Sequence, residues 1–235
     1  MPSLTTLRPR PVLSLASRAT QTHNFGMFEF TSGKLEGKSV VFAASNVGMV
    51  FCSSVTTTMV QHFKVRCILF TGVAGGLKEG QQIGDLVIGE DVVNYEFDCT
   101  GFVLPGKTHE LGEIPFVGWR FYDADPKLLG LALEWTPPEG VRVSKGRLAT
   151  GSIFITAEKK AQFNATQGPL LGNPVAAEME NAGAAQICKA YGVPYLSIRA
   201  LSDLVTGDAS ADFNAFCQTA ADNTFPLLSH MVKGL

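Results

Sequence analysis

The feature that most constrains the fold is an apolar run that ends in a cluster of glycines. Residues 66–71 (RCILFT) read as a strand with few polar positions, which is typical of a strand buried on both faces of a sheet. The run continues into residues 72–76 (GVAGG), where glycines permit tight turns and let a ligand approach main-chain N–H groups. The pattern predicts a central strand whose end borders a ligand site.

The rest of the chain indicates strands alternating with helices. The pattern predicts strands at residues 28–31, 38–44, 84–93, 141–150, 153–156, 174–179 and 194–201, and helices at 47–63, 124–135, 157–163, 181–191 and 210–232. Residues 99–120 are rich in glycine and proline and predict a long loop. For 235 residues that are 46% apolar, these elements predict one α/β domain with a mixed central sheet flanked by helices on both faces.

The N-terminus differs in composition from the rest of the chain. The first 28 residues contain three arginines, several serines and threonines, and no acidic residue. This composition can mark a targeting peptide, but a frayed end followed by a short strand at residues 11–17 is the simpler interpretation. We therefore divide the chain into residues 1–22, a shortened first strand or targeting remnant, and a domain at residues 23–235.

Charge and cysteine usage exclude several classes of protein. The net charge of −2 and the lack of a lysine and arginine cluster argue against a nucleic-acid partner. The longest apolar runs are broken before they reach a membrane-spanning length. The five cysteines are scattered without metal-ligand spacing, which indicates reduced thiols. We expect a cytoplasmic protein without a metal site, a disulfide framework or a membrane partner.

Acidic residues flank the predicted helix at residues 181–191. Glu178 and Glu180 precede it, and Asp203 follows the next strand. We expect the two strands to be parallel neighbours, as in half of a βαβ unit, which would join these carboxylates where open α/β sheets bind ligands. Two carboxylates at such a site suggest that one transfers a proton and the other binds a polyhydroxyl substrate. Because a glutamate at a helix start also complements the helix dipole, we assign that role to Glu178.

Five short motifs resemble the methylthioadenosine/S-adenosylhomocysteine nucleosidases of the purine nucleoside phosphorylase superfamily. They are TGVAGGL at 71–77, IGDLVI at 83–88, GSIFI at 151–155, EMENA at 178–182 and RALSD at 199–203, in the family's order and spacing. The resemblance covers roughly residues 26–233. It implies a nucleoside phosphorylase/hydrolase-like fold, a homodimer without cofactors, and hydrolysis of purine nucleosides of the 5′-methylthioadenosine or S-adenosylhomocysteine type that releases adenine.

The resemblance also implies roles for single residues. Asp203 matches the general acid that protonates the leaving purine at N7, and Ser202 would orient it. Glu180 matches the residue that accepts hydrogen bonds from the ribose hydroxyls and stabilises positive charge on the sugar. The other contacts that the resemblance implies are Met179 against the sugar, Phe154 on the purine face, the Ile155 backbone at its edge, and Phe102 in the partner subunit's pocket. Gly75 is the expected contact of the glycine run. Val73 stands where the family often has a serine, which removes a polar contact near the nucleophile, and Ser45 could hold an oxyanion.

Two positions bear on the nucleophile and its surroundings. Phosphorolysis needs cations for a phosphate dianion, typically an arginine two residues before the glycine motif. Phe70 occupies that position here, which favours water as the attacking group. Arg199 interrupts an apolar strand, and we interpret it as a buried ion-pair partner rather than a substrate contact.

The main departure from the family is a missing carboxylate near the N-terminus. In the nucleosidases a glutamate after the first strand positions or deprotonates the attacking water, but this chain has no acidic residue before Glu29. Losing a general base typically costs about 10²–10⁴-fold in rate. Three interpretations stay open: a nucleosidase, if need be of reduced activity, a nucleoside-binding or storage homologue that does not cleave, and a purine nucleoside phosphorylase.

Overall fold

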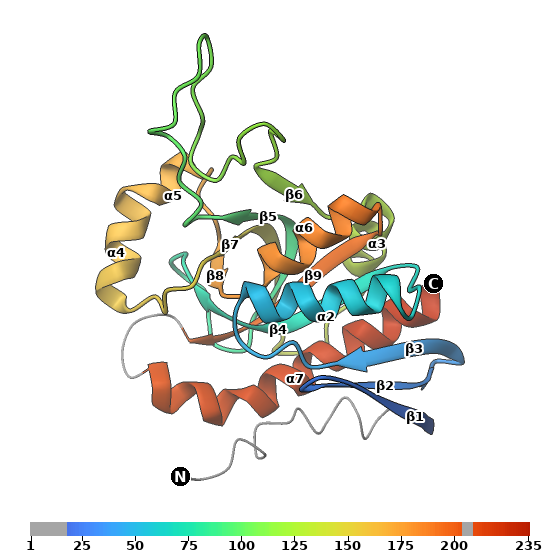
Figure 1. The fold of residues 1–235 in the computed structure, drawn as a ribbon. Helices are drawn as coiled ribbons and strands as arrows, with labels where there is room; N and C mark the ends of the chain where they lie inside the picture. The colour runs from blue at the N-terminus through green and yellow to red at the C-terminus, as the bar shows by residue number, and fades with distance from the viewer. Residues whose placement is uncertain (1–17, 204–208) are drawn as a thin grey trace.

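The computed structural model describes residues 18–203 and 209–235 (Figure 1). The strands are β1 (Arg18–Phe25), β2 (Phe28–Leu35), β3 (Lys38–Ala43), β4 (Ile68–Gly76), β5 (Leu86–Asn94), β6 (Phe121–Asp123), β7 (Val143–Thr150), β8 (Ala176–Glu178) and β9 (Tyr195–Asp203). The helices are α2 (Met49–Gln61), α3 (Pro126–Leu133), α4 (Ala157–Ala165), α5 (Gln167–Leu170), α6 (Asn181–Tyr191) and α7 (Ala209–Gly234). The strand predicted at residues 11–17 lies outside the described residues.

The described strands form two sheets. β1, β2 and β3 make an antiparallel sheet, while the central sheet has the order β6-β5-β7-β8-β4-β9 and mixes parallel and antiparallel pairs. β5 also pairs with β9, so that β5, β7, β8, β4 and β9 form a closed ring of strands with β6 beside it. The mixed sheet within one α/β fold agrees with the predicted fold class.

Helices cover both faces of the central sheet. One core joins Cys52 of α2 and Cys188 of α6 to the sheet, and a second joins Leu128 of α3 and Leu227 of α7 to its other side. Each fully buried leucine contributes about 1.5–3 kcal/mol to the stability of the fold. In Figure 1, α2 and α6 lie together above the long α7 helix, with β4 and β9 between them.

Helices α2 and α6 approach each other closely at a glycine. A Cβ atom added to Gly183 would lie 2.6 Å from the carbonyl oxygen of Met49 and 2.9 Å from Oγ of Ser53. Real Cβ atoms do not come this close to a carbonyl oxygen, so only glycine fits without moving one helix. This contact fixes the start of α2 relative to the start of α6.

Several details differ from the sequence-based expectations. β8 and β9 are not parallel neighbours, because β4 lies between them, parallel to β9 and antiparallel to β8. Residues 153–156 form a loop rather than a strand. Pro226 is expected to kink or divide the C-terminal helix, but α7 runs through it as one helix. β1 was not predicted; it spans the proposed boundary between residues 22 and 23, and that division of the chain stays a prediction.

No helix in the described part of the chain has both the length and the apolar character needed to cross a lipid bilayer. The four described cysteines, Cys52, Cys67, Cys99 and Cys188, are free thiols, as predicted.

Candidate active site

The two carboxylate-bearing segments meet at the glycine end of β4. Gly75 pairs with Ala177 of β8 on one side and with Asp203 of β9 on the other. The pairing with β9 shifts register between Ala74 and Gly75, and Ser202 is buried next to this irregularity. The segments that carry Glu180 and Asp203 are therefore brought together by β8 and β9, which both pair with β4. For Asp203, the strand pairing fixes the position of the backbone.

Glu178 lies buried at the base of this region. Its Oε2 accepts hydrogen bonds from the N–H groups of Glu180 and Asn181, both at 2.8 Å, and its Oε1 accepts one from the hydroxyl of Thr150. Burial raises the pKa of Glu178, while the positive charge of Arg199 and the donated hydrogen bonds act in the opposite direction. Glu178 thus holds the first turn of α6, the role assigned to it from the sequence.

Arg199 is the buried cation of the site. Its Nη2 lies 2.9 Å from Oε2 of Glu178, which confirms the predicted ion pair. Its Nη1 donates to the carbonyl of Val73 at 3.3 Å, and its guanidinium lies 4.6 Å from the centre of the Phe70 ring. A Cβ atom at Gly72 would collide with this guanidinium, so glycine at that position makes room for the arginine.

Glu180 is the carboxylate that remains accessible. Its side chain is 15% exposed, and its Oε1 accepts a hydrogen bond of 3.0 Å from the N–H of Gly48 at the start of α2. Its Oε2 lies 3.7 Å from Nη1 of Arg199. Its two oxygens lie against the start of α2 and the Arg199 guanidinium, and its accessible part can accept hydrogen bonds from a bound ligand. Met179 is half-buried beside it.

The loop after β7 begins next to the carboxylates. Thr150 pairs with Glu178, and the N–H of Gly151 donates to the carbonyl of Glu178 at 3.1 Å. The Tyr95 hydroxyl donates to the carbonyl of Ile153 at 3.2 Å and fixes the loop. Beyond that point, the Phe154 ring is 49% exposed, whereas Ile155 packs against a third core. The expected purine platform therefore lies on a loop anchored at this end of the sheet.

The remaining predicted site residues differ in their surroundings. Ser45 is half-buried just before α2, and its hydroxyl donates to the carbonyl of Asn46 at 3.1 Å. The Val73 side chain packs into the core formed with α3 and α7, away from Arg199. Phe102 is 43% exposed; its ring contacts are with His109 and Phe116 of its own loop, which projects from the body of the molecule in Figure 1.

Sequence reasoning missed a polar cluster behind the carboxylates. Oδ1 of Asn181 accepts hydrogen bonds, each 2.9 Å long, from the Tyr195 hydroxyl, the Ser197 hydroxyl and Nη2 of Arg199. The only sequence signal is a serine and an arginine at alternate positions of an apolar strand, which places both side chains on one face. Nothing in the sequence pairs them with the first residue of α6.

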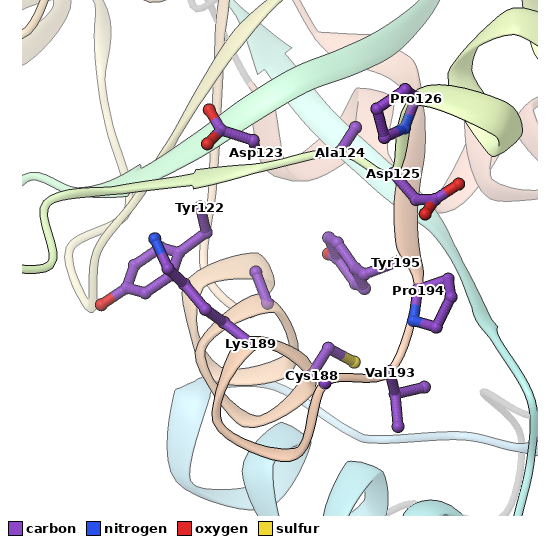
Figure 2. A pocket seen from close by; sticks show the side chains of 12 residues that line it. Tyr122, Asp123, Ala124, Asp125, Pro126, Cys188, Lys189, Val193, Pro194 and Tyr195 are labelled. Atoms are coloured by element: carbon purple, nitrogen blue, oxygen red, sulfur yellow. The ribbon is translucent and has the colours of Figure 1, made fainter.

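A hollow lies at the other end of β9. It has a volume of about 300 Å³ and lies between the start of β9, the end of α6 and the start of α3, with Asp123, Asp125 and Lys189 in its wall (Figure 2). Asp125 caps α3 by accepting from the N–H groups of Lys127 and Leu128. Figure 2 shows the Tyr195 ring between β9 and α6, so this residue joins the hollow to the Asn181 cluster.

Fold and site together define a class of protein. A family model described as the phosphorylase superfamily matches residues 11–233, so the chain belongs to that superfamily. The 5′-methylthioadenosine/S-adenosylhomocysteine nucleosidase of Geobacillus kaustophilus is 35% identical over 206 residues, which cover 87% of this chain and 84% of that protein. Within the superfamily the chain belongs to the methylthioadenosine/S-adenosylhomocysteine nucleosidase family, which confirms the resemblance seen in the five motifs.

Solved structures agree with this assignment. The nucleosidase from Neisseria meningitidis in complex with methylthio-immucillin-A superposes with a TM-score of 0.84 at 29% identity, covering 95% of this chain and 93% of that one. The futalosine hydrolase of Helicobacter pylori superposes with a TM-score of 0.84 at 30% identity, covering 96% and 92%. The fold is therefore shared by enzymes whose names give different nucleoside substrates.

Proposed function

We propose that this protein hydrolyses the N-glycosidic bond of purine nucleosides of the 5′-methylthioadenosine and S-adenosylhomocysteine type and releases adenine. The observation that carries the proposal is the partly accessible carboxylate of Glu180, held by Gly48 and Arg199 where β9 brings Ser202 and Asp203 to Gly75. The names of relatives that are about one-third identical over most of the chain support the same activity.

The arrangement fits the chemistry of glycosidic cleavage. The reaction passes through a sugar with oxocarbenium character, which a nearby carboxylate stabilises. Glu180 would accept hydrogen bonds from the ribose hydroxyls and supply that negative charge. Asp203, oriented by Ser202, would donate a proton to the purine. Phe154 would stack on the base, with Met179 against the sugar and Ile155 at the purine edge.

Water is the nucleophile that these surroundings favour. A phosphate dianion needs an arginine or lysine clamp, and the position where phosphorylases carry that arginine holds Phe70. The Phe70 ring packs under Arg199, whose charge is already shared between Glu178 and Glu180. Ser45 would border the attacking water, together with the backbone of Val73 and Gly75.

A futalosine-type nucleoside is the second substrate candidate. The Helicobacter pylori futalosine hydrolase matches this fold as closely as the Neisseria meningitidis nucleosidase does, by TM-score and by identity. Both activities would use the same acid and the same ribose contact, because both break a bond between a purine and C1′ of a ribose. The 5′-substituent distinguishes them, so a panel of nucleosides decides between them.

The test is release of free base by the purified protein. We expect adenine from 5′-methylthioadenosine at a rate that does not change when phosphate is added. Asp203→Asn removes the proton donor, and Glu180→Gln removes the charge beside the sugar; each is expected to lower kcat/KM by about 10²–10⁴-fold. Thr224→Val, which removes a buried hydroxyl of α7 that donates to Ala220, serves as the control.

Three results would contradict the proposal. A rate proportional to phosphate would identify a phosphorylase. Base release from futalosine alone would move the substrate to the second candidate. Tight nucleoside binding without any turnover would identify a binding or storage homologue that has lost the carboxylate found near the N-terminus of the nucleosidases.

We also propose that the protein acts as a homodimer in the cytoplasm. The loop at residues 99–120 exposes Phe102, Val103, Phe116 and Val117, which supports contact with a second copy and a role for Phe102 in its pocket. The free thiols support a reducing compartment.

A further inference from the structure

Asn181 joins three residues of the site through one oxygen atom. Its side chain is completely buried at the first position of α6, directly after Glu180. Oδ1 accepts hydrogen bonds from Tyr195, Ser197 and Arg199, each 2.9 Å long, while Nδ2 has no acceptor among the described residues. All its described side-chain hydrogen bonds therefore pass through the carbonyl oxygen, and the amide orientation follows from the three donors around it.

Arg199 is shared by two carboxylates that differ in distance and exposure. Its Nη2 donates to both Glu178 and Asn181 at 2.9 Å, whereas its Nη1 lies 3.7 Å from Glu180. Glu178 is buried and makes the shorter contact, so attraction alone would draw the guanidinium toward it. The Asn181 oxygen holds Nη2 from another side and leaves Nη1 directed at Val73 and Glu180.

We propose that Asn181 is a positioning residue: through Arg199 it sets the orientation of the Glu180 carboxylate toward the ribose hydroxyls. The proposal rests on the proposed function, because that function assigns the hydroxyls to Glu180. Asn181 acts through another residue and touches neither the base nor the sugar. Its two hydroxyl partners, Tyr195 and Ser197, fix the asparagine in turn.

The cost of burying this cluster supports a specific role. Asn181 lies among alanines of α6 that pack in an apolar core, where an amide donor without an acceptor is unfavourable by about 1–3 kcal/mol. A leucine of similar size would avoid that cost, but it would remove the oxygen to which Tyr195, Ser197 and Arg199 donate. The presence of asparagine at this position is therefore better explained by the three hydrogen bonds to its oxygen than by packing.

Tyr195 extends the cluster toward the other end of β9. Its ring lines the hollow at the start of β9 (Figure 2). Its hydroxyl donates a hydrogen bond to Oδ1 of Asn181. Ser197, two residues further along β9, points to the same oxygen, and Arg199 follows after two more. Three successive inward positions of one strand thus hold one asparagine of the facing helix.

The experiment compares 5′-methylthioadenosine with its 2′-deoxy analogue, which lacks one hydroxyl that Glu180 would hold. Asn181→Leu is expected to lower kcat/KM for the ribonucleoside by about 10- to 100-fold, the range for a hydrogen bond to a charged group. The same variant should change kcat/KM for the deoxynucleoside by less than threefold, so that discrimination between the two collapses. A merely structural defect would lower both values together.

Two further kinds of variant keep the test independent of folding. Asn181→Asp retains the acceptor oxygens and is expected to retain the discrimination, while its added negative charge raises the pKa of neighbouring carboxylates and moves the acid limb of the pH profile to higher pH. Ser197→Ala and Tyr195→Phe each remove one donor and should reduce the discrimination part of the way. Thr224→Val is the matched control and should leave it at the parent value.

The outcomes separate this inference from the proposed function. If the parent discriminates between the two nucleosides and Asn181→Leu discriminates equally, Asn181 is not a positioning residue and the inference is overturned alone. If the parent binds both nucleosides without turnover, the ratio of their dissociation constants by calorimetry gives the same comparison. A parent that neither binds nor cleaves either nucleoside overturns both statements.

Discussion

At the scale of single residues, the Glu180 carboxylate depends on groups far apart in the sequence. The N–H of Gly48, 132 residues earlier, holds one oxygen, and Arg199 of β9 lies near the other. The sequence indicates that Glu180 is important because it lies at a helix start next to a strand. It does not indicate Gly48 as its partner, because that contact depends on how α2 packs against α6.

Two buried thiols give a prediction about pH. Burial raises the pKa of Cys52 and of Cys188 from 9.0 to about 12. The unfolded chain releases these protons near pH 9, whereas the folded chain retains them until about pH 12. We therefore expect the thiols to contribute full stability below pH 9 and the free energy of unfolding to fall as the pH rises above it.

The measurement is denaturant unfolding between pH 8 and about pH 10.5, together with alkylation by iodoacetamide at pH 8.5 followed by mass spectrometry. Cys52 and Cys188 should stay unlabelled in the native protein and react in denaturant, with the half-buried Cys99 of the loop as the reactive control. Labelling of Cys52 at the rate of Cys99 in native protein would show that α2 does not pack Cys52 into the core as described.

At the scale of elements, the contact between α2 and α6 gives a second prediction. Gly183→Ala places a methyl group 2.6 Å from the Met49 carbonyl and should lower stability by about 1–3 kcal/mol. Because α2 also carries the N–H group that holds Glu180, we expect KM for the nucleoside to rise in the same variant. Chemical denaturation and steady-state kinetics measure the two effects.

Helix α3 provides the matched control. Gly130 is also a helical glycine, but a Cβ atom there has nothing within 4 Å. Gly130→Ala should raise stability by about 0.5–1 kcal/mol, because alanine loses less backbone entropy than glycine in a helix. Equal destabilisation by both substitutions would rule out close packing at Gly183 as the cause.

The sequence predicts local elements better than their pairing. α6 begins and ends where its pattern indicates, because Glu178 holds its first N–H groups, and Gly192 adopts the left-handed conformation (φ 67°) that ends it. The direction of β8 could not be predicted, since three residues carry too little pattern to specify a partner strand. The Asn181 cluster was missed because hydrogen bonds between a strand and a helix depend on tertiary packing, which the local sequence pattern does not specify.

At the scale of the whole molecule, the loop at residues 99–120 gives a prediction about assembly. Phe116 is 81% exposed and contacts the ring of Phe102, which in turn stacks on the buried His109. Removing a large exposed aromatic anchor from an interface typically costs about 2 kcal/mol or more of binding free energy. Phe116→Asp should therefore weaken self-association about 30-fold or more, measured by sedimentation equilibrium.

Met27→Asp is the control for this experiment. Met27 is 67% exposed in the turn between β1 and β2, in a part of the chain separate from the loop. The Met27→Asp substitution should leave both self-association and activity unchanged. Phe116→Asp should raise KM as the two copies separate. A parent protein that sediments as a monomer at all concentrations would refute the proposed homodimer.

The ring of strands described above is narrowest where β4 meets β8. That joint is only two residues wide, Gly75–Gly76 against Ala176–Ala177, whereas β4 and β9 pair over eight positions. Glu180 follows β8 on one side of this joint, and Asp203 ends β9, the strand that pairs with β4 on the other side. In the proposed function, a nucleoside bound to both Glu180 and Asp203 would link β8 to β9 across the narrowest pairing of the ring. Bound substrate would then raise the free energy of unfolding, because a ligand that binds only the folded state shifts the unfolding equilibrium toward that state.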